Sequence, residues 1–252
     1  MYKRQSEGDT VYVAAGRYKE GINIDQRMVL IGESKETTVI EGGTNVDVVK
    51  ITNNSSSGNV VLKEFTIEYG GDGIWIISSS FDISDVIIHE NGGAGIRINA
   101  SVGKITNAVI RKNGSSSKWG GGIRMQDQSG GKVDFSNVLI ADNTCIYHGC
   151  AVHISNADAT FNQVTIVNNK TNDGKVENNI HIYKESDVKF TNSILWNKKP
   201  AVVDPSGYEP AKLSISYSIV EGGWSTIGSL GSKPYFLTVS YTHLTLPTNR
   251  EV

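Results

Sequence analysis

The chain of 252 residues carries 24 Lys and Arg against 26 Asp and Glu, a formal net charge of −2 at pH 7. This balance argues against nucleic acid and against an anionic membrane surface as partners. No apolar run approaches the roughly 18 residues of a transmembrane helix, so we expect no membrane span in this sequence. The 27 Gly and 5 Pro, with abundant Ser, Thr and Asn, are typical of many short strands joined by tight turns.

The two ends of the sequence do not fit the residues next to them. Residues 1–5 and 239–252 resemble translated sequencing-adapter read-through, so we expect a single domain over 6–238 that is truncated at both ends. On this interpretation, the absence of a signal peptide gives no information about localisation.

The first part of the domain consists of short apolar segments in an alternating pattern. We expect strands within 8–18, 22–24, 28–32, 38–42 and 48–51, and we interpret them as the first one or two coils of a repeat. Alternation with a period of two predicts strands rather than helices.

One pattern then recurs along the chain, in copies that begin at residues 62, 83, 105, 135, 161, 190 and 215. Each copy has an alternating apolar segment, an Asn, a Gly-rich turn and a second short strand. A single coil cannot bury its own apolar side, but stacked coils share one core. The variable spacing between copies indicates one structural unit per copy with loops of different length. We therefore predict an all-β fold, a single-stranded right-handed parallel β-helix of about eight to ten coils.

Stacking would place equivalent polar residues above one another, about 4.8 Å apart. Two columns of asparagine follow, and we expect both to be structural ladders that satisfy backbone groups at the corners. The first column comprises Asn91, Asn113, Asn143 and Asn169, and the second comprises Asn107, Asn137 and Asn192.

The two cysteines, Cys145 and Cys150, lie five positions apart. They would fit a local disulfide in an oxidising compartment, or two buried free thiols. Their spacing is not a metal signature, because structural zinc requires about four such ligands. We expect no metal site.

Several segments resemble a known group of proteins. Residues 8–18, followed by 30–32 and 38–42, resemble the opening of pectate-lyase-like β-helix proteins. Residues 192–197 and 216–224 are similar to the late coils of bacterial surface proteins with a choice-of-anchor Q region. The resemblance covers about 8–237 and implies an exported bacterial protein, extracellular or on the cell surface. It leaves the activity open, because this superfamily includes lyases, hydrolases and adhesins.

The second strands of the copies predict an outward column between their inward apolar residues, formed by Trp75, Arg97, Arg124, His153 and His181. Two guanidinium groups one coil apart repel by about 0.8 kcal/mol even in water, and a bound polyanion would offset this repulsion. Trp75 could stack on a sugar ring or on Arg97. The alternative is a solvated face whose charges have no common role.

The first strands predict a second outward column, which changes from charged to apolar residues. It comprises Glu68, His89, Arg111, Ala141, Val167 and Trp196. We expect its apolar half to lie under a loop such as the segment 198–212.

No catalytic residue can be assigned from the sequence. Hydrolysis of a glycoside needs two carboxylates about 5–10 Å apart. Asp82, Asp85, Asp127, Asp142 and Asp158 qualify by residue type alone, and most of them occupy positions expected for turns. The resemblance to pectate lyases raises a different possibility, in which Arg97 or Arg124 abstracts a proton that calcium has acidified. No cofactor is expected otherwise.

The leading hypothesis is therefore a secreted or cell-surface protein, monomeric and non-catalytic, that contacts polysaccharide along the Trp/Arg/His column. A lyase or glycoside hydrolase acting on an acidic, pectin-like polysaccharide is the first alternative. A structural stalk or adhesin segment is the second.

Overall fold

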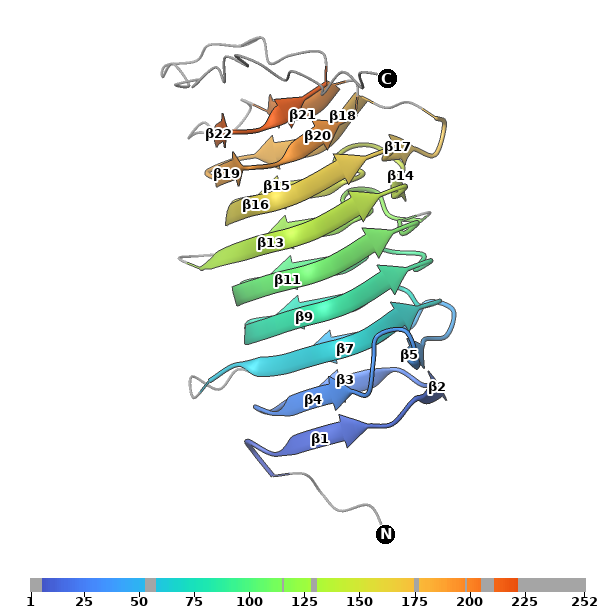
Figure 1. The fold of residues 1–252 in the computed structure, drawn as a ribbon. Helices are drawn as coiled ribbons and strands as arrows, with labels where there is room; N and C mark the ends of the chain where they lie inside the picture. Colours follow the sequence, from blue (N-terminus) through green and yellow to red (C-terminus); the bar gives the residue numbers. More distant parts are fainter. Residues whose placement is uncertain are drawn as a thin grey trace, which may run out of the picture.

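The computed structural model describes residues 6–52, 58–114, 116–127, 131–174, 177–197, 199–204 and 211–221. Within these residues the chain forms β-strands and no helix. The strands stack level upon level into an elongated solenoid, with the first coils at one end and the last coils at the other (Figure 1). Residues 1–5 and 239–252, expected to be artefacts, lie outside the described part.

The first sheet is built around a path of nine stacked strands. These are β1 (Thr10–Val13), β4 (Val29–Gly32), β7 (Val60–Glu68), β9 (Ser80–His89), β11 (Val102–Arg111), β13 (Lys132–Ala141), β16 (Asp158–Val167), β19 (Asp187–Thr191) and β22 (Lys212–Ser216). Four shorter strands extend the same sheet, namely β2 (Gly16–Lys19), β5 (Thr38–Glu41), β20 (Ile194–Trp196) and β23 (Ile219–Val220).

The second sheet has eight strands. These are β3 (Ile22–Ile24), β6 (Val49–Ile51), β8 (Ile74–Ile77), β10 (Ile96–Asn99), β12 (Ile123–Gln126), β15 (Val152–Ser155), β18 (Glu177–Tyr183) and β21 (Lys199–Asp204). A separate two-stranded sheet joins β14 (Thr144–Cys145) to β17 (Lys170–Thr171). Between β3 and β21 the described chain makes about seven turns, slightly fewer than the eight to ten coils expected for the whole domain.

Every strand pairs in parallel with its equivalent in the next coil, which confirms the predicted right-handed parallel β-helix. The inward residues of the second sheet form one file of Ile96, Ile123, Val152 and Ile180, all fully buried. On the first sheet, the rings of Phe135, Phe161 and Phe190 stack with centroids 4.6 and 4.5 Å apart. The core is therefore a continuous apolar column rather than a set of separate clusters.

The first asparagine column runs through the buried corner between the two sheets. Asn143 is typical of it, because its Nδ2 donates to Asn169 Oδ1 at 3.0 Å and to the Ile110 carbonyl at 3.0 Å. Its Oδ1 accepts from the backbone N–H of Asn113 at 3.0 Å. Asn197 continues the ladder by accepting from Asn169 Nδ2 at 3.2 Å. The amides thus satisfy backbone groups at a turn from which water is excluded.

The second asparagine column lies at an exposed bend within the long strands. Asn107, Asn137 and Asn192 all have positive φ, between 53° and 54°. Asn is among the side chains that tolerate this left-handed conformation best. Asn137 donates to Asn107 at 2.9 Å, but Asn192 donates to Asn162 at 2.9 Å, because Gln163 takes the bend position of the intervening coil. The second column is therefore interrupted once.

Candidate functional site

The five residues of the predicted Trp/Arg/His column occupy equivalent positions on successive strands of the second sheet. The backbone register joins Trp75 to Arg97, Arg97 to Arg124, Arg124 to His153, and His153 to His181. Lys50 on β6 precedes Trp75 in the same file. Sequence reasoning missed Lys50, although it occupies the middle position of its apolar–polar–apolar segment, as the others do.

Trp75 lies between two cations. Lys50 Nζ is 4.6 Å from the centroid of its ring and Arg97 Cζ is 4.7 Å from it. Because these residues come from the coils on either side, each covers one face of the indole. The indole Nε1 donates to Asn99 Oδ1 at 3.2 Å. Of the two roles expected for Trp75, the ring therefore stacks on Arg97 and offers neither face to a sugar.

The two arginines have little countercharge. Arg97 Nη1 lies 3.6 Å from Asp72 Oδ2, beyond hydrogen-bond distance. Among the described residues, no carboxylate lies within ion-pair distance of Arg124, and the buried Nε atoms of both arginines have no hydrogen-bond partner. Burial, followed by the charge of Arg97, lowers the pKa of Arg124. A lowered pKa of this kind is expected for a positive charge that is partly buried and has no ion-pair partner.

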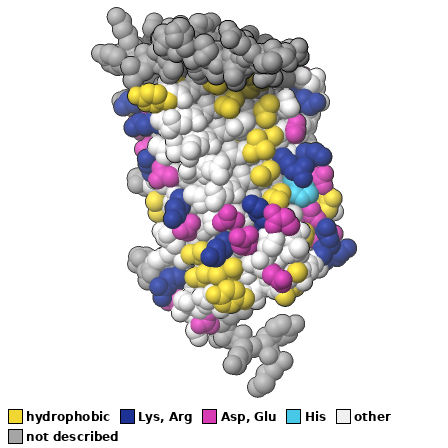
Figure 2. Space-filling model, viewed as in Figure 1, with side chains coloured by type: hydrophobic (Ala, Val, Ile, Leu, Met, Phe, Trp, Pro, Cys, Tyr) yellow, Lys and Arg dark blue, Asp and Glu magenta, His cyan; other side chains and the backbone are white. Residues whose placement is uncertain are grey.

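Several cations elsewhere on the molecule are paired with carboxylates more closely. Lys104 lies 3.0 Å from Asp82, Lys132 lies 3.2 Å from Asp134, and Arg17 reaches both Glu41, at 3.0 Å, and Glu68. Figure 2 shows side chains of both signs interspersed on the outward face of the first sheet. The arginine pair on the second sheet therefore differs from these cations in its local charge balance.

Asp72 is the carboxylate that approaches the arginines, and sequence reasoning did not single it out. Its Oδ1 accepts from the backbone N–H of Ala94 at 2.7 Å. Burial raises the pKa of Asp72, an effect that this hydrogen bond opposes. The sequence did contain a pattern that could have indicated Asp72. Asp47 and Asp72 each stand three positions before the outward residue of a second strand.

The two histidines do not face solvent, contrary to the expectation of one open outward column. His153 is 6% exposed and His181 is 9% exposed. Trp119 stacks on His153 with ring centroids 6.0 Å apart, and His148 stacks on His181 at 5.2 Å. The physical reason is the length of the turns, because the copies that contain Asn113 and Asn143 have longer segments before their second strands. These longer turns fold back over the column.

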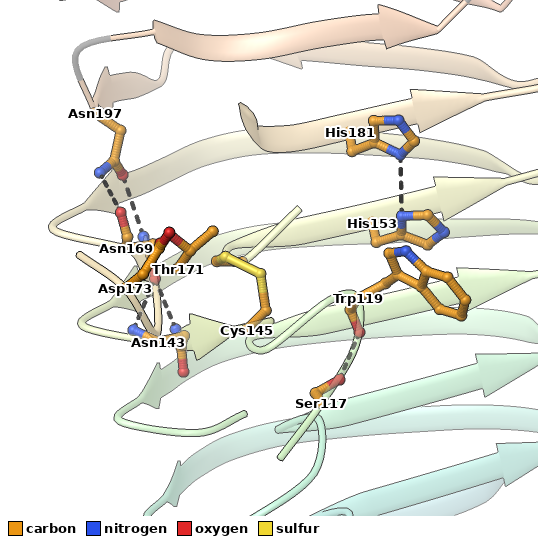
Figure 3. The surroundings of a disulfide bond; sticks show 11 residues. Ser117, Trp119, Asn143, Cys145, His153, Asn169, Thr171, Asp173, His181 and Asn197 are labelled. Atoms are coloured by element: carbon orange, nitrogen blue, oxygen red, sulfur yellow. Dashed lines mark hydrogen bonds between the residues drawn. A yellow bond between two sulfur atoms is a disulfide. The ribbon is translucent and has the colours of Figure 1, made fainter. Parts of the chain in front are cut away.

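We call the covering segments, residues 117–120 and 146–149, the roof. Three backbone hydrogen bonds join its two parts, from Ile146 to Ser117 at 2.8 Å, from Tyr147 to Lys118 at 3.0 Å, and from Gly120 to His148 at 3.3 Å. A disulfide between Cys145 and Cys150 closes the base of the second segment, near Trp119 and the histidines (Figure 3). The cysteines are therefore not free thiols in this structure.

A second polar cluster lies at the ends of the first-sheet strands. The carboxylate of Glu68, 4% exposed, contacts Arg17 and lies 2.9 Å from His89 Nε2. His89 Nδ1 lies 3.5 Å from Glu90, whose carboxylate raises the pKa of Tyr69 through a hydrogen bond. Glu68 is paired with both Arg17 and His89, whereas the buried Nδ1 of His89 has no hydrogen-bond partner; the cluster is an ion-pair network that ties β2 and β5 to β7 and β9.

The apolar half of the first-sheet column ends at Trp196, which is 49% exposed. The loop expected to cover it, 198–212, lies largely outside the residues whose side chains the structure describes. The expected cover therefore stays a prediction.

The aspartates suggested by residue type do not converge on the arginines. Asp85, Asp127 and Asp142 have φ near 55° and form bends, Asp82 pairs with Lys104, and Asp158 accepts a backbone N–H at 2.8 Å. Across the described part of the chain, no group of three or more His, Cys, Asp or Glu residues could hold a metal ion. No helix in that part is long and apolar enough to cross a membrane.

These features define the class of the molecule as a right-handed parallel β-helix with an arginine file on one face. The chain belongs to the family described as "Right handed beta helix region", whose model matches residues 40–222. No curated protein sequence matches the chain.

Three solved structures are similar in fold. An alginate lyase from Paenibacillus sp. str. FPU-7 has 13% identity and a TM-score of 0.53, over 86% of this chain and 90% of that chain. The pectin methylesterase PemA from Erwinia chrysanthemi has 11% identity and a TM-score of 0.44, over 89% and 84%. The catalytic unit of an α-1,3-glucanase from Streptomyces thermodiastaticus strain HF3-3 has 12% identity and a TM-score of 0.36, over 86% and 64%. At these identities the likeness concerns the fold alone.

Proposed function

We propose that this chain is an exported or cell-surface β-helix protein that binds acidic polysaccharide along the file of Lys50, Trp75, Arg97 and Arg124, as a non-catalytic binding protein. One observation carries the proposal: Arg97 and Arg124 are neighbours in register, and among the residues that the structure describes a single carboxylate approaches them, at 3.6 Å. Like charges in this arrangement repel, and a bound polyanion relieves the repulsion.

The spacing of the file supports a linear ligand. Successive coils lie about 4.8 Å apart, so the cations form a straight array along the solenoid axis. An acidic polysaccharide carries charges at repeated intervals and can follow such an array. Guanidinium groups form strong, bidentate hydrogen bonds with carboxylates, and partial burial strengthens them. Trp75 holds Lys50 and Arg97 in place and so acts as a positioning residue.

The proposal is tested by titrating the protein with polygalacturonate and with dextran sulfate, using neutral dextran as the control ligand. We expect Arg97→Ala with Arg124→Ala to lower the affinity for both polyanions at least about tenfold, since two charge-assisted contacts are lost. The matched variant, Lys104→Ala with Arg111→Ala, removes the same charge from the first sheet and should change the affinity less than about twofold. Equal effects of the two double variants, or no binding at all, would overturn the proposal.

A second candidate function is cleavage of the same polymer, and the position of Asp72 favours it. A buried carboxyl whose pKa is raised can donate a proton, and Asp72 stands beside Arg97. Incubation with polygalacturonate and calcium should then produce unsaturated ends, seen by ultraviolet absorbance, and Asp72→Asn should abolish them. Calcium is included because proton abstraction by an arginine requires an acidified substrate. A wild-type protein that stays silent with several polymers and across the pH range would exclude this candidate.

A further inference from the structure

We propose that the polysaccharide-binding face continues beneath the roof, over His153 and His181, and that protonation of this histidine pair opens the roof to acidic polysaccharide. This inference rests on the proposed function, because the ligand is the same. It adds a covered extension of the site and a signal that uncovers it.

The geometry of the pair carries the inference. His153 Nδ1 and His181 Nδ1 lie 3.1 Å apart, and the rings stack with centroids 5.1 Å apart (Figure 3). In such a contact one nitrogen donates and the other accepts, so one ring must lack a proton at Nδ1. If both rings were protonated, two N–H donors and two positive charges would face each other. The closed arrangement is therefore incompatible with a doubly protonated pair.

The groups that face His153 add positive charge rather than negative. His153 faces Arg124 from β12, His181 from β18 and His148 from the roof, and no carboxylate among the described residues lies within ion-pair distance of it. On the strand of His181, the Tyr183 ring lies 6.2 Å from the imidazole, and Lys184 Nζ lies over that ring at 5.5 Å. Burial, with the charges of His181, Arg124 and His148, lowers the pKa of His153 to about 3.

The roof is the element free to respond. The strands that carry the two histidines are paired with neighbours inside the second sheet, whereas the roof contacts them through the faces of Trp119 and His148. Three backbone hydrogen bonds join its two segments, so opening of the roof separates the segments and breaks these bonds. Ile146 and Tyr147 are exposed on its outer side. Trp119 also lies over one face of Arg124, 5.4 Å from Cζ, so opening the roof exposes a second face of a guanidinium that is already partly accessible.

The direction of the pH effect follows from proton linkage. In the open form His153 returns to the ordinary histidine pKa of about 6.5, whereas in the closed form it stays neutral down to about 3. The open form therefore binds more protons, and each pH unit below about 6.5 favours it by up to about tenfold per proton. The uncovered file then presents Arg97, Arg124, His153 and His181 as four cations along one line.

Two measurements test the inference. The first is binding of dextran sulfate, whose sulfates stay charged, at about pH 7.5 and about pH 5; we expect the wild-type affinity to rise at least about tenfold at the lower pH. The second needs no ligand: hydrogen exchange of the Ile146 and Tyr147 amides, expressed as protection factors. Their protection should fall at the lower pH, because their acceptors lie in the other segment of the roof.

The matched variants are His153→Gln and His181→Gln, which keep a polar side chain but cannot titrate. Each should flatten the pH ratio of binding and preserve amide protection at about pH 5; two variants are used so that misfolding of one leaves the other. Amides that stay protected at the lower pH in the wild-type protein would overturn the inference, even if polyanions bind. Loss of protection without binding at either pH would instead overturn the proposed function.

Discussion

Individual side chains set the charge balance of the arginine file. Arg97 and Arg124 are in register, but within the described part of the chain only Arg97 has a carboxylate within ion-pair distance, that of Asp72. Asp72 is itself fixed by the Ala94 N–H, so it cannot move closer without losing a hydrogen bond of 2.7 Å. It therefore offsets part of the positive charge without neutralising it, and it competes with any bound anion.

Removal of that competing charge should strengthen binding. We expect Asp72→Asn to raise the affinity for dextran sulfate by about two- to fivefold, because an attractive partner of Arg97 is replaced by a neutral amide of the same shape. Titration calorimetry at constant ionic strength measures this. The control, Asp82→Asn, frees Lys104 on the first sheet and should leave the affinity unchanged. Weaker binding in the Asp72 variant would contradict the assigned role of this carboxylate.

The difference between the predicted and the observed site also arises at this scale. The sequence pattern placed Trp75, Arg97, Arg124, His153 and His181 in one file, because period-two alternation and a fixed register determine which side chains point outward. An irregular turn that covers a side chain leaves no periodic pattern in the sequence by which the cover could be predicted. The roof over the histidines, and the contact of Lys50 with the second face of Trp75, therefore emerged only from the three-dimensional arrangement.

Among the structural elements, the buried corner governs how successive coils align. Its asparagine ladder joins five coils, from Asn91 to Asn197, through side-chain amides that also cap backbone groups. The repeat in the sequence predicted four of these residues. The exposed asparagine column has a different basis, since its members are needed for their left-handed backbone rather than for a continuous ladder.

This distinction makes the two columns respond differently to substitution. Asn143→Ala should lower the free energy of unfolding by about 2–4 kcal/mol, because the buried N–H of Asn113 and the Ile110 carbonyl lose their partner. Asn137→Gly keeps the positive φ and loses one exposed hydrogen bond, so it should cost about 1 kcal/mol or less. Urea unfolding followed by circular dichroism compares the two. Equal losses would show that the ladder does not hold the coils.

At the scale of the whole molecule, the net charge of −2 gives no general attraction for polyanions. Binding must come from a local array whose members lie close in space but far apart in sequence. Arg97 and Arg124 are separated by a complete coil of the chain, and register alone makes them neighbours. At about 1 M salt, charges are screened within about 3 Å, so we expect binding to an exposed array to weaken strongly as ionic strength rises.

The most direct measurement is a crystal structure of the protein with a short acidic oligosaccharide such as an oligogalacturonate. The account predicts an extended chain on the second sheet, with carboxylates about 2.7–2.9 Å from the guanidinium nitrogens of Arg97 and Arg124. An oligosaccharide bound on the first sheet, or guanidinium groups of Arg97 and Arg124 that make no contact with the oligosaccharide at saturating ligand, would contradict it.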